Sequence, residues 1–90
     1  MKVRNMTGRT GQPVKNQFII SDGDALIFQS YNTVIAKREG YGENERIYLD
    51  RDSWDYSTTT GKYRNQFLGE GIEATRSKIA SGEYILTDLN

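Results

Sequence analysis

The sequence of 90 residues contains no cysteine and no histidine, and its only proline is Pro13. The absence of cysteine excludes disulfides and thiolate metal sites. The absence of histidine removes the commonest general base and the commonest metal ligand. A zinc site is therefore not expected, because only carboxylates remain as ligands. From these absences we expect a protein that is not an enzyme, with no catalytic residues, no cofactor and no metal.

Long apolar segments are also missing. The longest apolar runs span only a few residues, which is too short for a helix that crosses a membrane. Residues 1–15 carry charge but no apolar stretch of the kind found in secretory signals. These features predict a soluble cytosolic protein without membrane contact.

The 12 basic and 12 acidic residues give no net charge, but the beginning of the chain is basic. Residues 1–16 contain no acid, and their basic residues are Lys2, Arg4, Arg9 and Lys15. Residues 1–12 also lack hydrophobic periodicity and are rich in loop-forming residues. We expect residues 1–12 to form a flexible basic arm ahead of a single domain over residues 13–90. Such an arm can bind an anionic partner or, more commonly, keeps a terminus solvated.

Alternating apolar residues predict a hairpin at the start of the domain. Residues 14–20 form its first strand, with one apolar and one mixed side. The apolar side holds Val14, Asn16, Phe18 and Ile20, and the mixed side holds Lys15, Gln17 and Ile19. Asp22 and Gly23 then favour a tight turn, because glycine accepts a positive φ. Residues 25–31 return as the second strand.

Further extended segments follow this hairpin. Residues 34–37 and 46–49 both have the alternation of strands. Residues 32 and 33 form either a turn between strands or a bend within one long strand. A polar loop over residues 38–45 separates the two segments.

The next stretch, residues 56–71 (YSTTTGKYRNQFLGEG), combines a helix start, an apolar face and a helix end. Ser57 can cap this helix by accepting hydrogen bonds from free amides, and Asp55 is the alternative cap. Gly69 suits the left-handed conformation that ends a helix. The apolar side consists of Tyr63, Phe67 and Leu68. Because so short a helix is marginal alone, this side must dock on the strands.

A second, largely exposed helix is expected over residues 72–81, followed by a short strand over residues 84–86. The order of elements predicts an α+β domain, in which a small antiparallel sheet of about four to five strands packs against two short helices. Both helices belong to the C-terminal half, and the last short strand closes the chain.

Two polar clusters invite a chemical interpretation. Asp50, Asp52 and Asp55 have the alternate spacing of calcium ligands, but the glycine and distal glutamate of an EF-hand are missing. Solvated turn and capping residues are therefore the favoured interpretation. Residues 57–60 with Lys62 resemble an anion site at a helix N-terminus, although no P-loop is present. Capping within the domain is favoured there, and a bound phosphate is the minority interpretation.

Six tyrosines and one tryptophan are many aromatic residues for this length. They can complete the periphery of a small core, and this use weighs at least as much as any binding role. Exposed aromatics beside arginine also favour binding to a protein, either a partner or a second copy of this chain. For such a surface we single out Trp54, Tyr56, Lys62, Tyr63 and Arg64.

A nucleic-acid surface is the alternative, in which aromatic residues stack on bases of a single strand. It would combine the basic arm with Lys37, Arg38, Lys62 and Arg64. Zero net charge and the absence of RNP motifs weaken this interpretation.

Four segments of the chain together resemble a known family. They are GQPVKNQFII, FQSYNTVIAK, WDYSTTTGKYRNQFLGE and KIASGEYIL. They resemble short, uncharacterised proteins of tailed bacteriophages and prophages with the pattern NQF…FxSYxTxIA…WxYSxTTxKYxxxFLG…KIxxGEY. The resemblance covers residues 11–86. Gly61 departs from the pattern, since a more helix-compatible residue such as serine is expected there, and this departure predicts a less rigid first helical turn.

The resemblance implies an accessory protein made in the cytoplasm of a host bacterium. It implies no activity and supplies no catalytic residues. Small phage proteins often bind a host protein or nucleic acid, including components of host defence, and this is an analogy from origin. We therefore predict a non-enzymatic module that binds a host protein in defence or host takeover, with nucleic-acid binding as the alternative.

Overall fold

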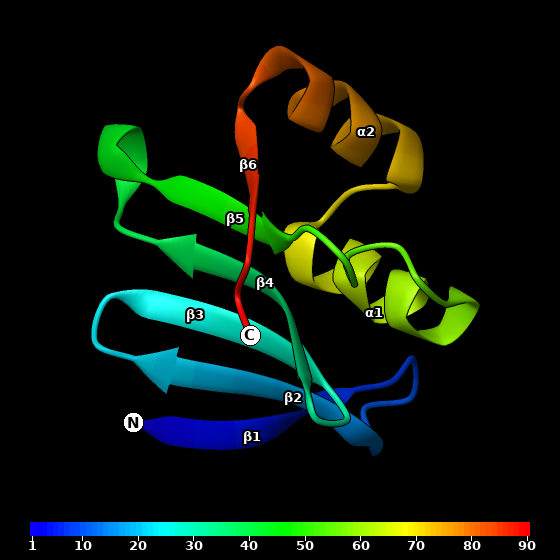
Figure 1. The fold of residues 1–90 in the computed structure, drawn as a ribbon. Helices are drawn as coiled ribbons and strands as arrows, with labels where there is room; N and C mark the ends of the chain where they lie inside the picture. The colour runs from blue at the N-terminus through cyan, green and yellow to red at the C-terminus, as the bar shows by residue number, and fades with distance from the viewer.

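All residues from 1 to 90 are described in a computed structural model. Six strands form one sheet in the order in which they occur in the chain (Figure 1). Strands β1 to β5 pair antiparallel, whereas β6 runs parallel to β5. The strands are β1 Lys2–Thr7, β2 Pro13–Asp22, β3 Ala25–Ser30, β4 Thr33–Glu39, β5 Arg46–Asp50 and β6 Tyr84–Thr87.

The α+β prediction is confirmed, but the sheet is mixed and has more strands than expected. The chain leaves β5, forms two helices and returns to the same edge of the sheet as β6. A strand that returns through such a crossover can lie parallel to its neighbour, which a short hairpin turn does not permit. The antiparallel prediction is therefore wrong for the last strand.

The additional strand lies at the beginning of the chain. The sequence predicts no regular structure in residues 1–12, yet Lys2–Thr7 form β1 and pair with β2. Met6 is the only buried residue of β1. With only one apolar residue facing the core, the sequence of β1 lacks the alternation of apolar and polar residues that marks a strand. Its extended conformation therefore depends on pairing with β2.

Strand β2 contains an irregularity that reverses the expected side. Gln17 and Ile19 of the mixed side are buried, whereas Phe18 and Ile20 are only half-buried. The cause is Asn16, which has a φ of 66° and accepts a hydrogen bond from the Tyr31 amide at 2.7 Å. Such a bulge interrupts the alternation of side chains between the two faces. A core side assigned from the apolar count alone is therefore wrong here.

The hairpin and the turn after it are as predicted. Gly23 connects β2 and β3 with a φ of 63°. A turn also connects β3 and β4, so the first of the two alternatives, a turn between strands, is confirmed. The turn residues are Tyr31 and Asn32, one position earlier than expected. The β3–β4 register shifts beside Phe28, and this irregularity leaves both Ile35 and Ala36 completely buried.

Helix α1 covers residues Thr58–Leu68 as expected. The Ser57 hydroxyl accepts a hydrogen bond from the Thr60 amide, and Gly69 ends the helix with a φ of 72°. Tyr63 and Leu68 are buried in the core, which confirms the predicted apolar side. The third member of that side, Phe67, stacks on Phe28 of β3 with 5.9 Å between the ring centroids.

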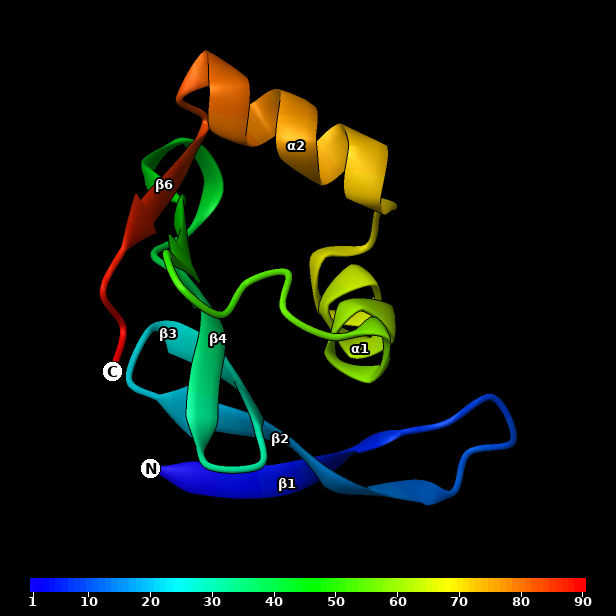
Figure 2. The same ribbon diagram turned by 45° about the vertical axis from the view of Figure 1, so that its right-hand side comes forward.

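Helix α2, Ile72–Ser81, is mostly exposed, as predicted, and Thr75 is its only buried residue. Figure 2 shows both helices on the same side of the curved sheet. A 3₁₀ turn at Gly42–Asn44 interrupts the loop between β4 and β5. The segment between β5 and α1 carries Trp54, which is half-buried and packs against the core. These elements place the β5–α1 segment, the start of α1 and the start of α2 next to one another.

Candidate functional site

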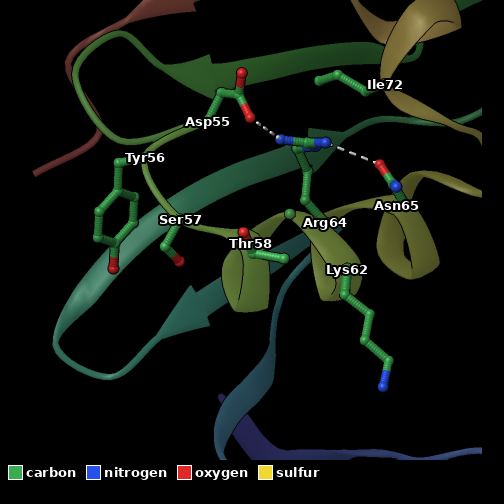
Figure 3. A pocket seen from close by; sticks show the side chains of 9 residues that line it. Asp55, Tyr56, Ser57, Thr58, Lys62, Arg64, Asn65 and Ile72 are labelled. Carbon is green, nitrogen blue, oxygen red and sulfur yellow. Dashed lines mark hydrogen bonds and ion pairs between the residues drawn. The ribbon is translucent and has the colours of Figure 1, made fainter.

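An open hollow lies between the β5–α1 segment, the first turns of α1 and the start of α2, with a volume of about 780 Å³ (Figure 3). We call it the Arg64 hollow. It is lined by Asp55, Tyr56, Ser57, Thr58, Gly61, Lys62, Arg64, Asn65 and Ile72. Only Tyr56 and Ile72 contribute large apolar side chains, so this is a polar surface depression and not an apolar ligand cavity.

The structure brings three of the five predicted binding residues to this hollow. Tyr56 and Lys62 are exposed and available for contact. Arg64 also lines the hollow, but its side chain is only 2% exposed. Trp54 lies behind Arg64, and Tyr63 belongs to the core, so neither of these two lines the hollow.

Three acceptors fix the guanidinium of Arg64. It donates to the Trp54 carbonyl at 2.8 Å, to Asp55 Oδ1 at 3.2 Å and to Asn65 Oδ1 at 2.9 Å. It also lies 5.4 Å from the centroid of the Trp54 ring, in cation–π contact. Figure 3 shows it between the side chains of Asp55 and Asn65, while Lys62 extends away. Arg64 therefore joins the β5–α1 segment to α1 and forms a rigid floor for the hollow.

Gly61 lies beside this guanidinium. A Cβ at Gly61 would come within 3.6 Å of Nη2 of Arg64, which is an ordinary contact distance. The glycine therefore widens the hollow without being required by a steric clash. Its backbone has ordinary helical conformation, so nothing in the local geometry demands glycine.

The start of α1 is occupied by internal hydrogen bonds. Ser57 caps Thr60, and the Thr60 hydroxyl lies 3.1 Å from the buried Ser30 hydroxyl of β3. The capping interpretation is thus confirmed for Ser57. Asp55 also lines the hollow and places a carboxylate beside the helix start. A phosphate would meet this negative charge, so the arrangement does not favour the anion interpretation.

A model of a protein family of unknown function, DUF8033, matches residues 1–85 of the chain. The chain belongs to this family. Comparisons with curated proteins and with solved structures gave no match. Membership of DUF8033 covers nearly the whole fold, including both helices and the Arg64 hollow, and it carries no statement about activity.

The three aspartates considered as metal ligands have separate roles in this DUF8033 member. Asp50 is buried and accepts hydrogen bonds from the Ser53 hydroxyl and from the Leu89 amide. Burial raises the pKa of Asp50, but these donors outweigh it and hold the pKa below its ordinary value. Asp52 is exposed, and Asp55 pairs with Arg64. Asp50 is therefore a structural tie to the C-terminal segment and not a solvated turn residue.

A second carboxylate, that of the partly buried Glu70, was not signalled by the sequence. Glu70 Oε1 accepts from Lys78 Nζ at 2.7 Å and from the Tyr84 hydroxyl at 2.8 Å. Its Oε2 accepts from the Thr75 hydroxyl at 2.7 Å. Burial raises the pKa of Glu70, but the donors outweigh burial and leave the pKa below its ordinary value. Burial, reinforced by the hydrogen bond to Glu70, raises the pKa of Tyr84.

A carboxylate beside tyrosine and lysine would favour catalysis if it faced a deep pocket. Glu70, Lys78 and Tyr84 line none of the hollows in the protein. Their hydrogen bonds are made to one another, so the cluster joins α2 to β6. No group of three or more acidic residues gathers in a way that could hold a metal ion. No helix has the length and apolar character needed to cross a membrane.

Proposed function

We propose that this DUF8033 member is a non-enzymatic binding module, an accessory protein of a tailed bacteriophage or prophage. It acts in the host cytoplasm on a host protein that serves defence or is a target of host takeover. The phage origin rests on the resemblance of the four sequence segments described above. The binding role rests on one observation, the Arg64 hollow with its rigid floor and two exposed side chains, Tyr56 and Lys62.

The arrangement has the features of a small protein-binding surface. Tyr56 is 52% exposed although it is aromatic, and Lys62 of α1 lines the same hollow and is also exposed. Tyrosine contributes much of the binding energy in protein interfaces, because it combines a large rigid ring with a hydroxyl. Since Arg64 is already ordered, binding of a partner costs little conformational entropy at the floor of the hollow. The satisfied cluster around Glu70 supports the non-enzymatic part of the proposal.

Site-specific photo-crosslinking in a bacterial lysate tests this function. A benzoylphenylalanine at position 56 is expected to give a discrete cross-linked product, and Lys62→Glu should remove it. Tyr41 is the matched control, because it is 73% exposed and lies in the loop between β4 and β5, away from the hollow. A cross-linked dimer of the bait would identify a second copy of the chain as the partner. Identical products from positions 56 and 41, or bait alone with a monomeric profile, would contradict the proposal.

Nucleic-acid binding receives less support from the geometry. Of the basic residues expected to contact nucleic acid, three have an acidic neighbour: Lys37 with Glu39 at 2.9 Å, Arg38 with Glu45 at 3.7 Å, and Arg64 with Asp55 at 3.2 Å. Basic side chains that are already paired with acids release few counterions when they meet a phosphate backbone. The affinity for nucleic acid and its salt dependence are therefore both expected to be weak. Titrations of labelled DNA and RNA across salt concentrations test this alternative, and steep salt-dependent binding would restore it.

A further inference from the structure

A second, smaller hollow lies on the helix side of the sheet, between the C-terminal end of α1 and strands β1 to β4. Its volume is about 220 Å³. The floor is apolar and is formed by Met6, Ile19, Leu26 and Phe67. In Figure 1 the β2–β3 turn lies at the end of the sheet that points away from α1.

Two arginines line this apolar floor, and no acidic residue does. Arg4 comes from β1 and is exposed, and none of the ion pairs in the protein includes it. Arg38 comes from β4, and its guanidinium lies 5.7 Å from the centroid of the Phe67 ring. The two cations therefore share one small hollow without a carboxylate in it.

The hydrogen bonding of Arg38 is incomplete. Its Nε–H is buried and has no hydrogen-bond acceptor. Its acidic neighbour is Glu45, whose Oε2 lies 3.7 Å from Nε, which is too far for a hydrogen bond. Glu45 lines the adjoining hollow at the β2–β3 turn and not this one. The Nε–H of Arg64 also lacks an acceptor, but the two Nη atoms of Arg64 donate to three acceptors inside the protein. The Nε–H of Arg38 therefore makes no hydrogen bond, although Glu45 lies within ion-pair distance of it.

The size and charge of the hollow define a class of ligand. A guanidinium is matched in shape and charge by a carboxylate, which it binds through two parallel N–H donors. A volume of about 220 Å³ is below the range of drug-sized ligand sites and suits one branched or aromatic apolar group. We propose that this hollow binds a small carboxylate with one apolar group, its charge between Arg4 and Arg38 and its apolar part on Phe67 and Leu26. Two sources carry this chemistry: a free small acid, and the C-terminal residue of another polypeptide.

An NMR titration of the ¹⁵N-labelled protein tests the site with N-acetyl-leucine as the probe. N-acetyl-leucinamide is the matched control, because it has nearly the same shape and no charge. The acid is expected to bind in the millimolar range and to shift amides of β1, β3 and the end of α1, with the amide binding about tenfold more weakly. This comparison uses the unaltered protein, so it does not depend on the folding of a variant.

Substitutions then locate the charge. Arg38→Gln and Arg4→Gln should each weaken binding of the acid about fivefold or more. Arg51→Gln is the control, because Arg51 is exposed and lines none of the hollows. Equal binding of acid and amide, equal binding of inorganic phosphate, no shifts at millimolar acid, or an Arg38→Gln variant with unchanged affinity would each overturn the proposal.

A final arm distinguishes the sources, with the acetylated tripeptide Ser-Gly-Leu as a second probe that ends in a free carboxylate. Tighter binding of the tripeptide than of N-acetyl-leucine supports a polypeptide C-terminus as the ligand. Equal or weaker binding supports a free acid. The site is separate from the Arg64 hollow, so its failure leaves the proposed protein-binding function unaffected.

Discussion

Replacing Arg64 should destabilise the fold far more than replacing the other arginine that contacts Asp55. Arg64→Ala removes the donor for the Trp54 carbonyl and for Asn65 Oδ1, and it removes the cation from Asp55. Arg76 also pairs with Asp55, at 3.4 Å, but its side chain is 62% exposed. The two arginines therefore form an internal comparison with one shared partner.

The size of each stability loss depends on whether the groups left behind can be hydrated by solvent. Breaking a fully buried ion pair costs about 3–5 kcal/mol, but Asp55 is 36% exposed and can be rehydrated. The lower end applies, so Arg64→Ala should cost about 3 kcal/mol, mainly from the unsatisfied acceptors and the lost packing on Trp54. Arg76→Ala should change stability by no more than about 0.5 kcal/mol, as other exposed pairs do. For a domain of this size the first value corresponds to a fall in Tm of about 12–24 °C.

Urea unfolding followed by circular dichroism measures both free energies, with the slope against urea as a check that unfolding remains two-state. Arg64→Lys should recover part of the loss, because lysine keeps the charge but cannot reach three acceptors in the guanidinium geometry. If Arg64→Ala and Arg76→Ala fall within about 0.5 kcal/mol of each other, the reasoning is wrong and Arg64 is solvated in solution.

The remaining predictions concern three other positions. Gly61→Ala should stabilise the protein by about 0.5–1 kcal/mol, because alanine is the better helix former and its Cβ meets only ordinary contacts; a lower Tm in calorimetry would show that the contact with Arg64 is too tight. The pKa of Glu70 lies below its ordinary value, so the stability it contributes is complete near neutral pH and is lost as pH falls below about 4.3. Glu70→Gln should flatten this acid loss in unfolding free energies measured from neutral to acid pH, and equal slopes would refute the assignment. Asn90→Ala should cost about 1 kcal/mol, because the Asn90 amide hydrogen-bonds both the N–H and the C=O of Val34; an unchanged urea midpoint would contradict it.

Local signals in the sequence were sufficient for the helices and the first hairpin. Ser57 and Gly69 are the residue types that begin and end a helix, and the structure uses both for those purposes. Gly23 has the positive φ that its turn requires. Each of these features depends on a few neighbouring residues, so the chemistry of the residue predicts the conformation.

Features that depend on distant pairing could not be read in this way. The left-handed Asn16 reverses the side of β2 that faces the core, and no short-range rule marks that asparagine. Strand β1 has only Met6 as an inward apolar residue, so its pattern is too weak to recognise.

The grouping of the candidate binding residues in space could be predicted in part, for the same reason. Tyr56 and Lys62 do line a hollow with Arg64, because all three come from one continuous segment. Tyr63 is buried, since its position on the apolar side of α1 outweighs its hydroxyl. The Glu70 cluster went unnoticed, because Tyr84 meets Glu70 only when β6 joins the sheet.

The parallel pairing of β5 and β6 has a consequence for the order in which the molecule can assemble. The first five strands are joined by short connections and can pair in succession, but β6 reaches β5 only after α1 and α2 have spanned the distance between them. Until then β5 is an open edge, with Leu49 beside unpaired backbone groups that invite association with other chains. The two helices thus hold the last strand against the sheet. Conditions that unfold the helices should expose the aggregation-prone edge of β5 well before the hairpins separate.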